Sequence, residues 1–82
     1  MPDDTADLRK AASAALDRAH LAAAAADGGK LRRALEDAAE ALDGTELRDA
    51  AYKVRAALAD LEKGQLVELE ILLEDARRSL AG

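Results

Sequence analysis

His20 is the first residue to consider for chemistry, because it is the only histidine in the chain and imidazole ordinarily titrates near neutral pH. Asp17 precedes it by three residues, so on a helix the carboxylate lies close enough to orient the imidazole. One interpretation is a cofactor site in which His20 ligates a haem iron, in space left free by the small side chains of Ala19 and Ala23. The other interpretation is a boundary histidine, half in solvent and bonded to Asp17.

The remaining reactive residues do not combine into a catalytic or metal site. Zinc usually takes four protein donors, whereas this chain supplies one imidazole and no thiolate. A di-iron site needs two Glu-x-x-His pairs, to which Asp17-x-x-His20 is the nearest match. Ser13 is nearly two helical turns from His20, and helical spacing does not bring Ser79 to it either. We therefore expect no catalytic residue, no metal and no resident cofactor, with the His20 site as the alternative.

The composition is that of a small helical protein. The chain has 82 residues, of which 50% are hydrophobic, mostly alanine and leucine, and 35% are charged. Strand-forming residues are nearly absent, which favours long helices over a sheet. A net charge of -5, together with the lack of any long basic run, argues against nucleic acid as a partner, because phosphate binding needs a clustered cationic face.

Nothing in the sequence suggests a membrane segment or a targeting signal. The first four residues, Met-Pro-Asp-Asp, are acidic where a signal peptide is cationic. The longest uncharged run, Leu21–Ala26, is far too short to cross a bilayer. The sequence thus predicts a soluble chain with no membrane partner. Its cellular compartment is left unknown, since there is no cysteine from which to infer the redox environment.

Breaks at glycine divide the chain into four predicted helices, at about 4–26, 30–43, 46–63 and 65–80, within a single domain spanning 1–82. In each segment the apolar residues recur with the period of a helix buried along one face. Gly28, Gly44 and Gly64 are expected to end the helices, and Thr45 is expected to cap the third. Because the connections are short, the predicted fold is an all-α, antiparallel up-down-up-down four-helix bundle.

Two of the predicted helices carry further expectations. The first presents mainly alanine to the core, while the others present leucine, so we expect it to lie unusually close to its neighbours. The second begins with Lys30, Arg32 and Arg33 and ends with acids, an order that opposes the helix dipole. Compensating charges are expected from the acidic start of the first helix or from Arg77 and Arg78 in the fourth.

Apolar residues outside the main core faces carry the functional signal. They are Leu21 and Ala25 in the first helix, Tyr52 in the third, and Val67 and Ile71 in the fourth. Scattered exposed apolar residues are normal, and that is one interpretation. If the patches of the first and fourth helices adjoin, they form a self-complementary surface, for which a twofold homo-oligomer is the commonest outcome. A third interpretation is that the same surface binds a designed protein target.

The chain as a whole resembles an idealised, de novo designed four-helix bundle. Three similar glycine-centred loops, a single methionine, the absence of cysteine and tryptophan, and helix propensity that agrees with the fold carry this resemblance, which rests on style and on no family motif. A natural alanine- and arginine-rich helical protein has a similar composition. The resemblance implies a non-enzymatic scaffold, assembly unit or protein-binding module.

The segment Arg18-Ala19-His20-Leu21 also resembles the start of the site in histidine phosphotransfer domains, which are four-helix bundles that relay phosphate through one exposed histidine. The segment Leu31–Glu40 is similar to the leucine- and acid-bearing helix that follows in that family. The family usually places a lysine and a glycine three and four residues after the histidine, where this chain has Ala23 and Ala24. Without a cation there, a phosphoryl group on His20 lacks stabilisation.

Overall fold

Four helices make up almost all of the computed structural model, which describes residues 4–81. They are α1 (Asp4–Ala24), α2 (Gly28–Leu42), α3 (Arg48–Lys63) and α4 (Leu66–Ala81). No β-strand occurs within these residues, so the all-α prediction is confirmed. The connections are short and comprise residues 25–27, 43–47 and 64–65.

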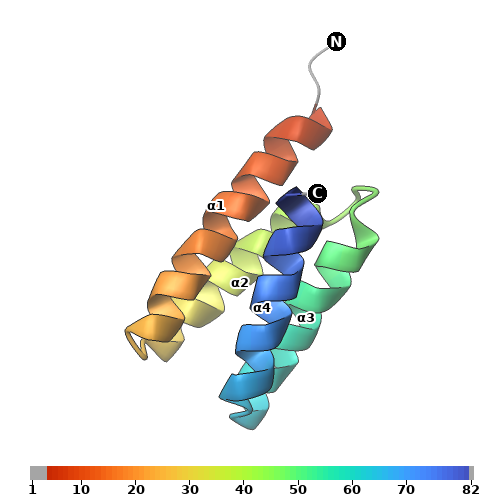
Figure 1. Ribbon diagram of the computed structural model, residues 1–82. Helices are drawn as coiled ribbons and strands as arrows, with labels where there is room; N and C mark the ends of the chain where they lie inside the picture. The colour runs from red at the N-terminus through yellow and green to blue at the C-terminus, as the bar shows by residue number, and fades with distance from the viewer. Residues whose placement is uncertain (1–3, 82) are drawn as a thin grey trace.

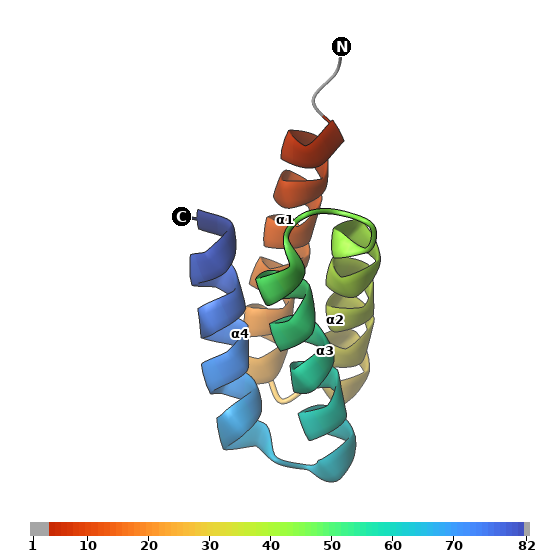
Figure 2. The same ribbon diagram turned by 90° about the vertical axis from the view of Figure 1, so that its right-hand side faces the viewer.

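The helices lie side by side in an elongated molecule 42 Å long and 19 Å across (Figures 1 and 2). Each helix packs against two others, in the ring order α1, α2, α3, α4, with α4 next to α1. The backbones approach most closely within the pairs α1/α2 and α3/α4, and least closely between α1 and α4. The α1–α2 and α3–α4 connections lie at one end of the molecule, and the α2–α3 connection lies at the other (Figure 1).

The core combines leucine with alanine along the centre of this ring. Its largest fully buried side chains are Leu16, Leu35, Leu42, Leu69 and Val54. Among the residues of α1 whose burial the structure describes, only alanines and Leu16 are buried, and α1 makes its more extensive contact with α2. The predicted close approach does not extend to α4, which is the more distant neighbour of α1.

The first connection turns at Ala26 rather than at the predicted glycine. Helix α1 ends at Ala24, and Ala26 has a positive φ of 56°. The amides of Ala26 and Asp27 donate to the carbonyls of Ala23 and Ala22, respectively, which is the Schellman pattern of a helix C-terminus. An alanine is strained in this conformation, because its Cβ comes too close to the following carbonyl oxygen.

Gly28 and Gly29 open α2 and do not end α1, so their predicted role as a stop signal is wrong. The Asp27 carboxylate accepts a hydrogen bond from the Lys30 amide at 3.1 Å and so caps α2. Because Asp27 caps α2, the helix begins at the next residue, Gly28. The other two glycines, Gly44 and Gly64, do follow helix ends and take the left-handed conformation, with φ of 77° and 76°.

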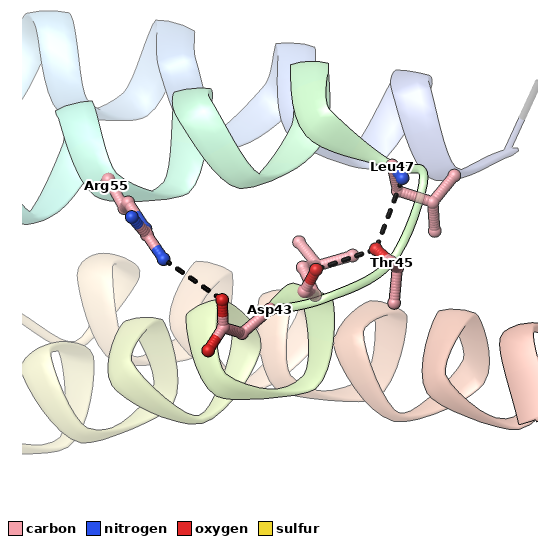
Figure 3. A network of polar contacts seen from close by, with 5 residues as sticks. Asp43, Thr45, Leu47 and Arg55 are labelled. Carbon is pink, nitrogen blue, oxygen red and sulfur yellow. Dashed lines mark hydrogen bonds and ion pairs between the residues drawn. The ribbon is translucent and has the colours of Figure 1, made fainter.

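Thr45 organises the α2–α3 connection but is not the N-cap of α3 (Figure 3). Its hydroxyl donates to the Leu42 carbonyl at 2.7 Å and accepts from the Leu47 amide at 3.2 Å. The N-cap position falls to Leu47, whose side chain makes no cap hydrogen bond. The same view shows Arg55 of α3 paired with Asp43 at 3.6 Å, so an ion pair adds to the two hydrogen bonds of Thr45 in holding the loop (Figure 3).

The charges that oppose the dipole of α2 are compensated only in part, by ion pairs of Asp37 with α1 and of Arg32 with α3. Helix α2 has no acid in its first turn and no base in its last. Arg18 of α1 lies 3.4 Å from Asp37, and Glu62 of α3 lies 3.7 Å from Arg32. The basic end of α4 pairs with α1 and within α4 instead. Arg77 and Arg78 are therefore not a source of compensation, because α4 does not pack against α2 within the described residues. The other predicted source, the acidic start of the first helix, includes Asp3, which lies outside the described residues.

Candidate functional site

An open apolar groove of about 450 Å³ lies between the second half of α1 and the first half of α2. The residues that line this α1–α2 groove are Arg18, Leu21, Ala22, Ala25, Asp27, Lys30, Arg33, Ala34 and Asp37. Leu21 is 68% exposed, a high value for a large apolar side chain. The neighbouring alanines are short, so they leave room beside Leu21 that none of the side chains described by the structure occupies.

The uncommitted charge of the α1–α2 groove is positive, although the chain as a whole carries a net charge of -5. Arg18 already pairs with Asp37 across the groove, and Asp27 caps α2. Lys30 and Arg33 have no ion-pair partner in the part of the chain that the structure describes. An anionic group that enters the groove therefore meets Lys30 and Arg33. The charged side chains of the lining sum to +1, because three cations face Asp27 and Asp37.

Of the predicted interface residues, only Leu21 and Ala25 belong to the α1–α2 groove. Val67 and Ile71 are 76% and 57% exposed and lie one turn apart on α4. Tyr52, which is 72% exposed, lines a separate depression beside the α2–α3 connection. No residue of α4 lines the α1–α2 groove, so these exposed residues fall on three distinct surfaces.

His20 is exposed and lines a depression between α1 and α4, together with Glu70, Leu73, Glu74 and Arg77. Asp17, expected to orient the imidazole, is instead paired with Arg77 at 3.0 Å. Arg77 supplies a cation that the sequence did not place near His20, but the two glutamates oppose a phosphoryl group there. Within residues 4–81, no cluster of three or more histidine or acidic side chains is arranged to hold a metal ion.

The structure does not bring His20, Ala19 and Ala23 together around one cavity. Ala19 is fully buried in the core, where neighbouring side chains cover it. Ala23 lines a smaller pocket of about 130 Å³ at the end of the bundle, with Leu31 and Leu69 among the other lining residues. The surroundings of His20 are therefore polar side chains of α4 rather than an alanine-lined space.

Asp60 is a buried acid that the sequence pattern did not single out. It lies on α3 and is only 6% exposed, and its Oδ2 atom has no hydrogen-bond partner among the described residues. An acid at the margin of an apolar helix face ordinarily points into solvent, so no sequence signal marks this one as buried. Burial without a partner costs free energy, which makes Asp60 a weak point of the core.

Asp49 joins the start of α3 to the end of α4. Its carboxylate lies 3.0 Å from the Lys53 ammonium and accepts a hydrogen bond from the Ser79 hydroxyl at 3.0 Å. Hydrogen bonds from Lys53 and Ser79, with the positive charge of Lys53, hold the pKa of Asp49 below its ordinary value. The contact is exposed and structural, since no cavity residue takes part in it.

No family model, curated protein or solved structure matches this chain. In the part of the chain that the structure describes, no helix has both the length and the apolar character needed to cross a membrane. The α1–α2 groove is consequently the feature from which a function can be argued.

Proposed function

We propose that the chain is a non-enzymatic protein-interaction module, an antiparallel up-down-up-down bundle that binds an acidic amphipathic helix in its α1–α2 groove. The observation that carries the proposal is one groove that combines exposed Leu21 with two unpaired cations, Lys30 and Arg33. An amphipathic helix laid into an apolar groove is a recurrent mode of peptide recognition. The short connections between successive helices support the antiparallel arrangement.

The spacing of the apolar side chains along α1 suits a helical partner. Ala25 is the first residue after α1, and its amide donates to the Leu21 carbonyl at 3.0 Å, so it continues the last turn and follows Leu21 at a separation of about 6 Å. A partner helix with two apolar side chains at the same spacing can place one beside each of them. Short alanines at this position let the partner backbone come near, which raises the contact area that two turns of helix can bury.

The charges around the α1–α2 groove favour a partner with acidic flanks. Lys30 stands in the first turn of α2, where the helix dipole disfavours a cation by about 0.3–1 kcal/mol, and Arg33 follows one turn later. Sites at which a local stability rule is broken are often functional sites. A partner glutamate beside Lys30 or Arg33 relieves this unfavourable interaction, so the same charges that weaken the free helix strengthen the complex.

The proposal is tested with two neighbouring arginines that differ only in their surroundings. Arg33 lines the groove, whereas Arg32 faces Glu62 of α3. The probe is a labelled synthetic acidic helix with two leucines one turn apart, titrated by fluorescence anisotropy. We expect Arg33→Glu to raise the Kd of this peptide by about tenfold, because a favourable charge contact becomes a repulsive one. Arg32→Glu changes the net charge equally and is expected to leave the Kd unchanged.

Two results contradict the proposal. One is an equal loss of affinity in the two variants, which indicates attraction by net charge alone. The other is the absence of peptide binding to the parent chain at high micromolar concentration. A peptide with lysines in place of its glutamates serves as the negative control, since it carries the same leucines and opposite flanks.

A further inference from the structure

We propose that the helix received by the α1–α2 groove is α4 of a second copy of this chain, so that copies join head to tail. This inference rests on the proposed function and names its partner. The inserting surface is the α4 ridge, defined as Val67 and Ile71. These two β-branched side chains stand in solvent one turn apart, and nothing else in the described chain covers them.

The α4 ridge has the spacing that the α1–α2 groove requires. Val67 and Ile71 are four residues apart on α4 and repeat at about 6 Å. Leu21 and Ala25 of the groove have the same spacing, because the hydrogen bond from the Ala25 amide to the Leu21 carbonyl continues the last turn of α1. The ridge side chains are large where Ala25 is small, and apolar surfaces of unequal size interlock when two helices pack.

The charges of the two surfaces are complementary. Glu70 and Glu74 follow Val67 and Ile71 by three residues each, which places them on the same side of α4 as the ridge. Glu70 has no ion-pair partner within residues 4–81, and Glu74 pairs only with exposed Arg78 on its own helix. Docking of the ridge brings Glu70, the acid without an ion-pair partner, toward Lys30 and Arg33, while Glu74 stays paired with Arg78.

The two surfaces lie on different sides of one molecule, and this decides the kind of assembly. The groove belongs to α1 and α2, whereas α4 packs against α1 and α3 and makes no close approach to α2 in the residues described. Contact between two unlike surfaces is heterologous and extends to a further copy or closes into a ring. The contact spans about two helical turns, so it buries less surface than the roughly 1,600 Å² of a stable interface. We therefore expect a Kd for self-association in the micromolar range or weaker.

The experiment separates the two halves of the contact. The groove variant Leu21→Glu keeps the α4 ridge, and the ridge variant Val67→Lys/Ile71→Lys keeps the groove. All three positions are exposed, so neither change touches the core. Masses are measured by sedimentation velocity from low to high micromolar concentration, with circular dichroism to verify helix content. Controls with the same charge changes elsewhere are Ala14→Glu on α1 and Tyr52→Lys/Ala59→Lys on α3, which are exposed and outside both surfaces.

We expect the parent chain to grow beyond a dimer as concentration rises, and each variant alone to associate at least about tenfold more weakly. An equimolar mixture of the two variants is expected to form a dimer and stop there, because one intact groove meets one intact ridge. The controls are expected to assemble like the parent chain. A parent chain that stays monomeric, a parent that stops at a twofold dimer, or a mixture that stays monomeric overturns the inference.

The test also distinguishes this inference from the proposed function. If the parent chain is monomeric but still binds the acidic peptide with the Arg33-dependent affinity, the groove receives a foreign helix and only the self-association is wrong. If neither the peptide nor a second copy binds, both proposals are wrong.

Discussion

Ala26 and Gly64 occupy equivalent positions in two helix C-caps, and only the second position holds the residue that suits it. In both caps the next amide donates to a carbonyl five residues back, from Asp27 at 2.9 Å and from Gln65 at 2.8 Å. The left-handed residue has φ 56° at Ala26 and 76° at Gly64. An L side chain is disfavoured in this region by roughly 1–2 kcal/mol relative to glycine.

Exchanging these two residue types should change stability in opposite directions. Ala26→Gly is expected to raise the free energy of unfolding by about 1 kcal/mol, because relief of the strain outweighs the greater flexibility of the unfolded chain. Gly64→Ala is expected to lower it by a similar amount, even though a Cβ there meets nothing within 4 Å. Urea denaturation of both variants measures the difference. A loss of stability in Ala26→Gly would refute the assignment of strain to Ala26.

Asp60 offers a second prediction at the scale of one side chain. Asp60→Leu is expected to raise the free energy of unfolding by about 1–3 kcal/mol, since it removes a buried carboxylate oxygen that has no partner. The control is Asp7→Leu, which changes the same functional group at an exposed position of α1 and should shift stability by less than about 0.5 kcal/mol. Thermal or urea unfolding compares the two. Equal effects would show that loss of negative charge, not burial, is responsible.

At the scale of the elements, the contact of Asp49 with Ser79 makes the α3–α4 pair sensitive to acid. The pKa of Asp49 is lowered in the folded chain by its bonds to Lys53 and Ser79, so its carboxylate is held in the charged form. A lowered folded-state pKa contributes stability above the ordinary aspartate pKa, and this contribution is lost as the pH falls through the folded-state value. The closure of α3 on α4 should therefore weaken in acid.

Removing the Ser79 hydroxyl should reveal this linkage. In Ser79→Ala the pKa of Asp49 is expected to rise toward its ordinary value, because one of the two bonds that lower it is gone. The side-chain carboxyl titration, followed by NMR, measures the shift directly. Ser79→Ala should also be less stable than the parent chain at neutral pH, with the difference shrinking below the folded-state pKa of Asp49. Ser13→Ala, at an exposed serine of α1, is the control and should leave the pKa unchanged.

Individual elements show how far the sequence predicted the structure. The helical periodicity of the apolar residues predicted the four helices, because a helix with one buried face shows this repeat whichever elements it packs against. The turn at Ala26 was missed, since an Asp-Gly-Gly segment is compatible both with ending one helix and with starting the next. In the structure Asp27 caps α2, and the glycines follow that cap into the helix. The local sequence does not distinguish a helix end from a helix start at this segment, because tertiary packing determines where α1 ends.

The candidate site was predicted only in part for a related reason. Leu21 and Ala25 were identified from α1 alone, as apolar residues outside its core face. Their cationic neighbours Lys30 and Arg33 come from α2, and no pattern within one helix shows which face of the next will adjoin it. The same limit applies to Asp60, whose burial depends on how closely α3 and α4 pack.

At the scale of the whole molecule, charge is distributed unevenly enough to guide association. The net charge of -5 makes two copies repel at long range, whereas Lys30 and Arg33 place unpaired cations at the α1–α2 groove. Under the proposed mode of association, a contact that places acidic flanks against these two cations opposes the repulsion. The proposal therefore implies that partners are selected by orientation rather than by total charge.

A comparison of one buried and one exposed leucine separates residues that stabilise the whole molecule from residues that bind a partner. Leu35 is fully buried in a core made largely of alanine, whereas Leu21 is 68% exposed in the α1–α2 groove. Leu35→Ala is expected to lower the free energy of unfolding by about 2–5 kcal/mol, because it removes buried apolar surface and leaves a cavity in a thin core. That loss is comparable to the total stability of roughly 3–5 kcal/mol that a single core supplies in a domain of this size, so much of the population should unfold.

Leu21→Ala is expected to change the free energy of unfolding by less than about 0.5 kcal/mol while weakening binding of the acidic peptide. Urea unfolding and the peptide titration, run on both variants, measure the two effects independently. A Leu21→Ala variant as unstable as Leu35→Ala would mean that Leu21 serves the fold and not a partner.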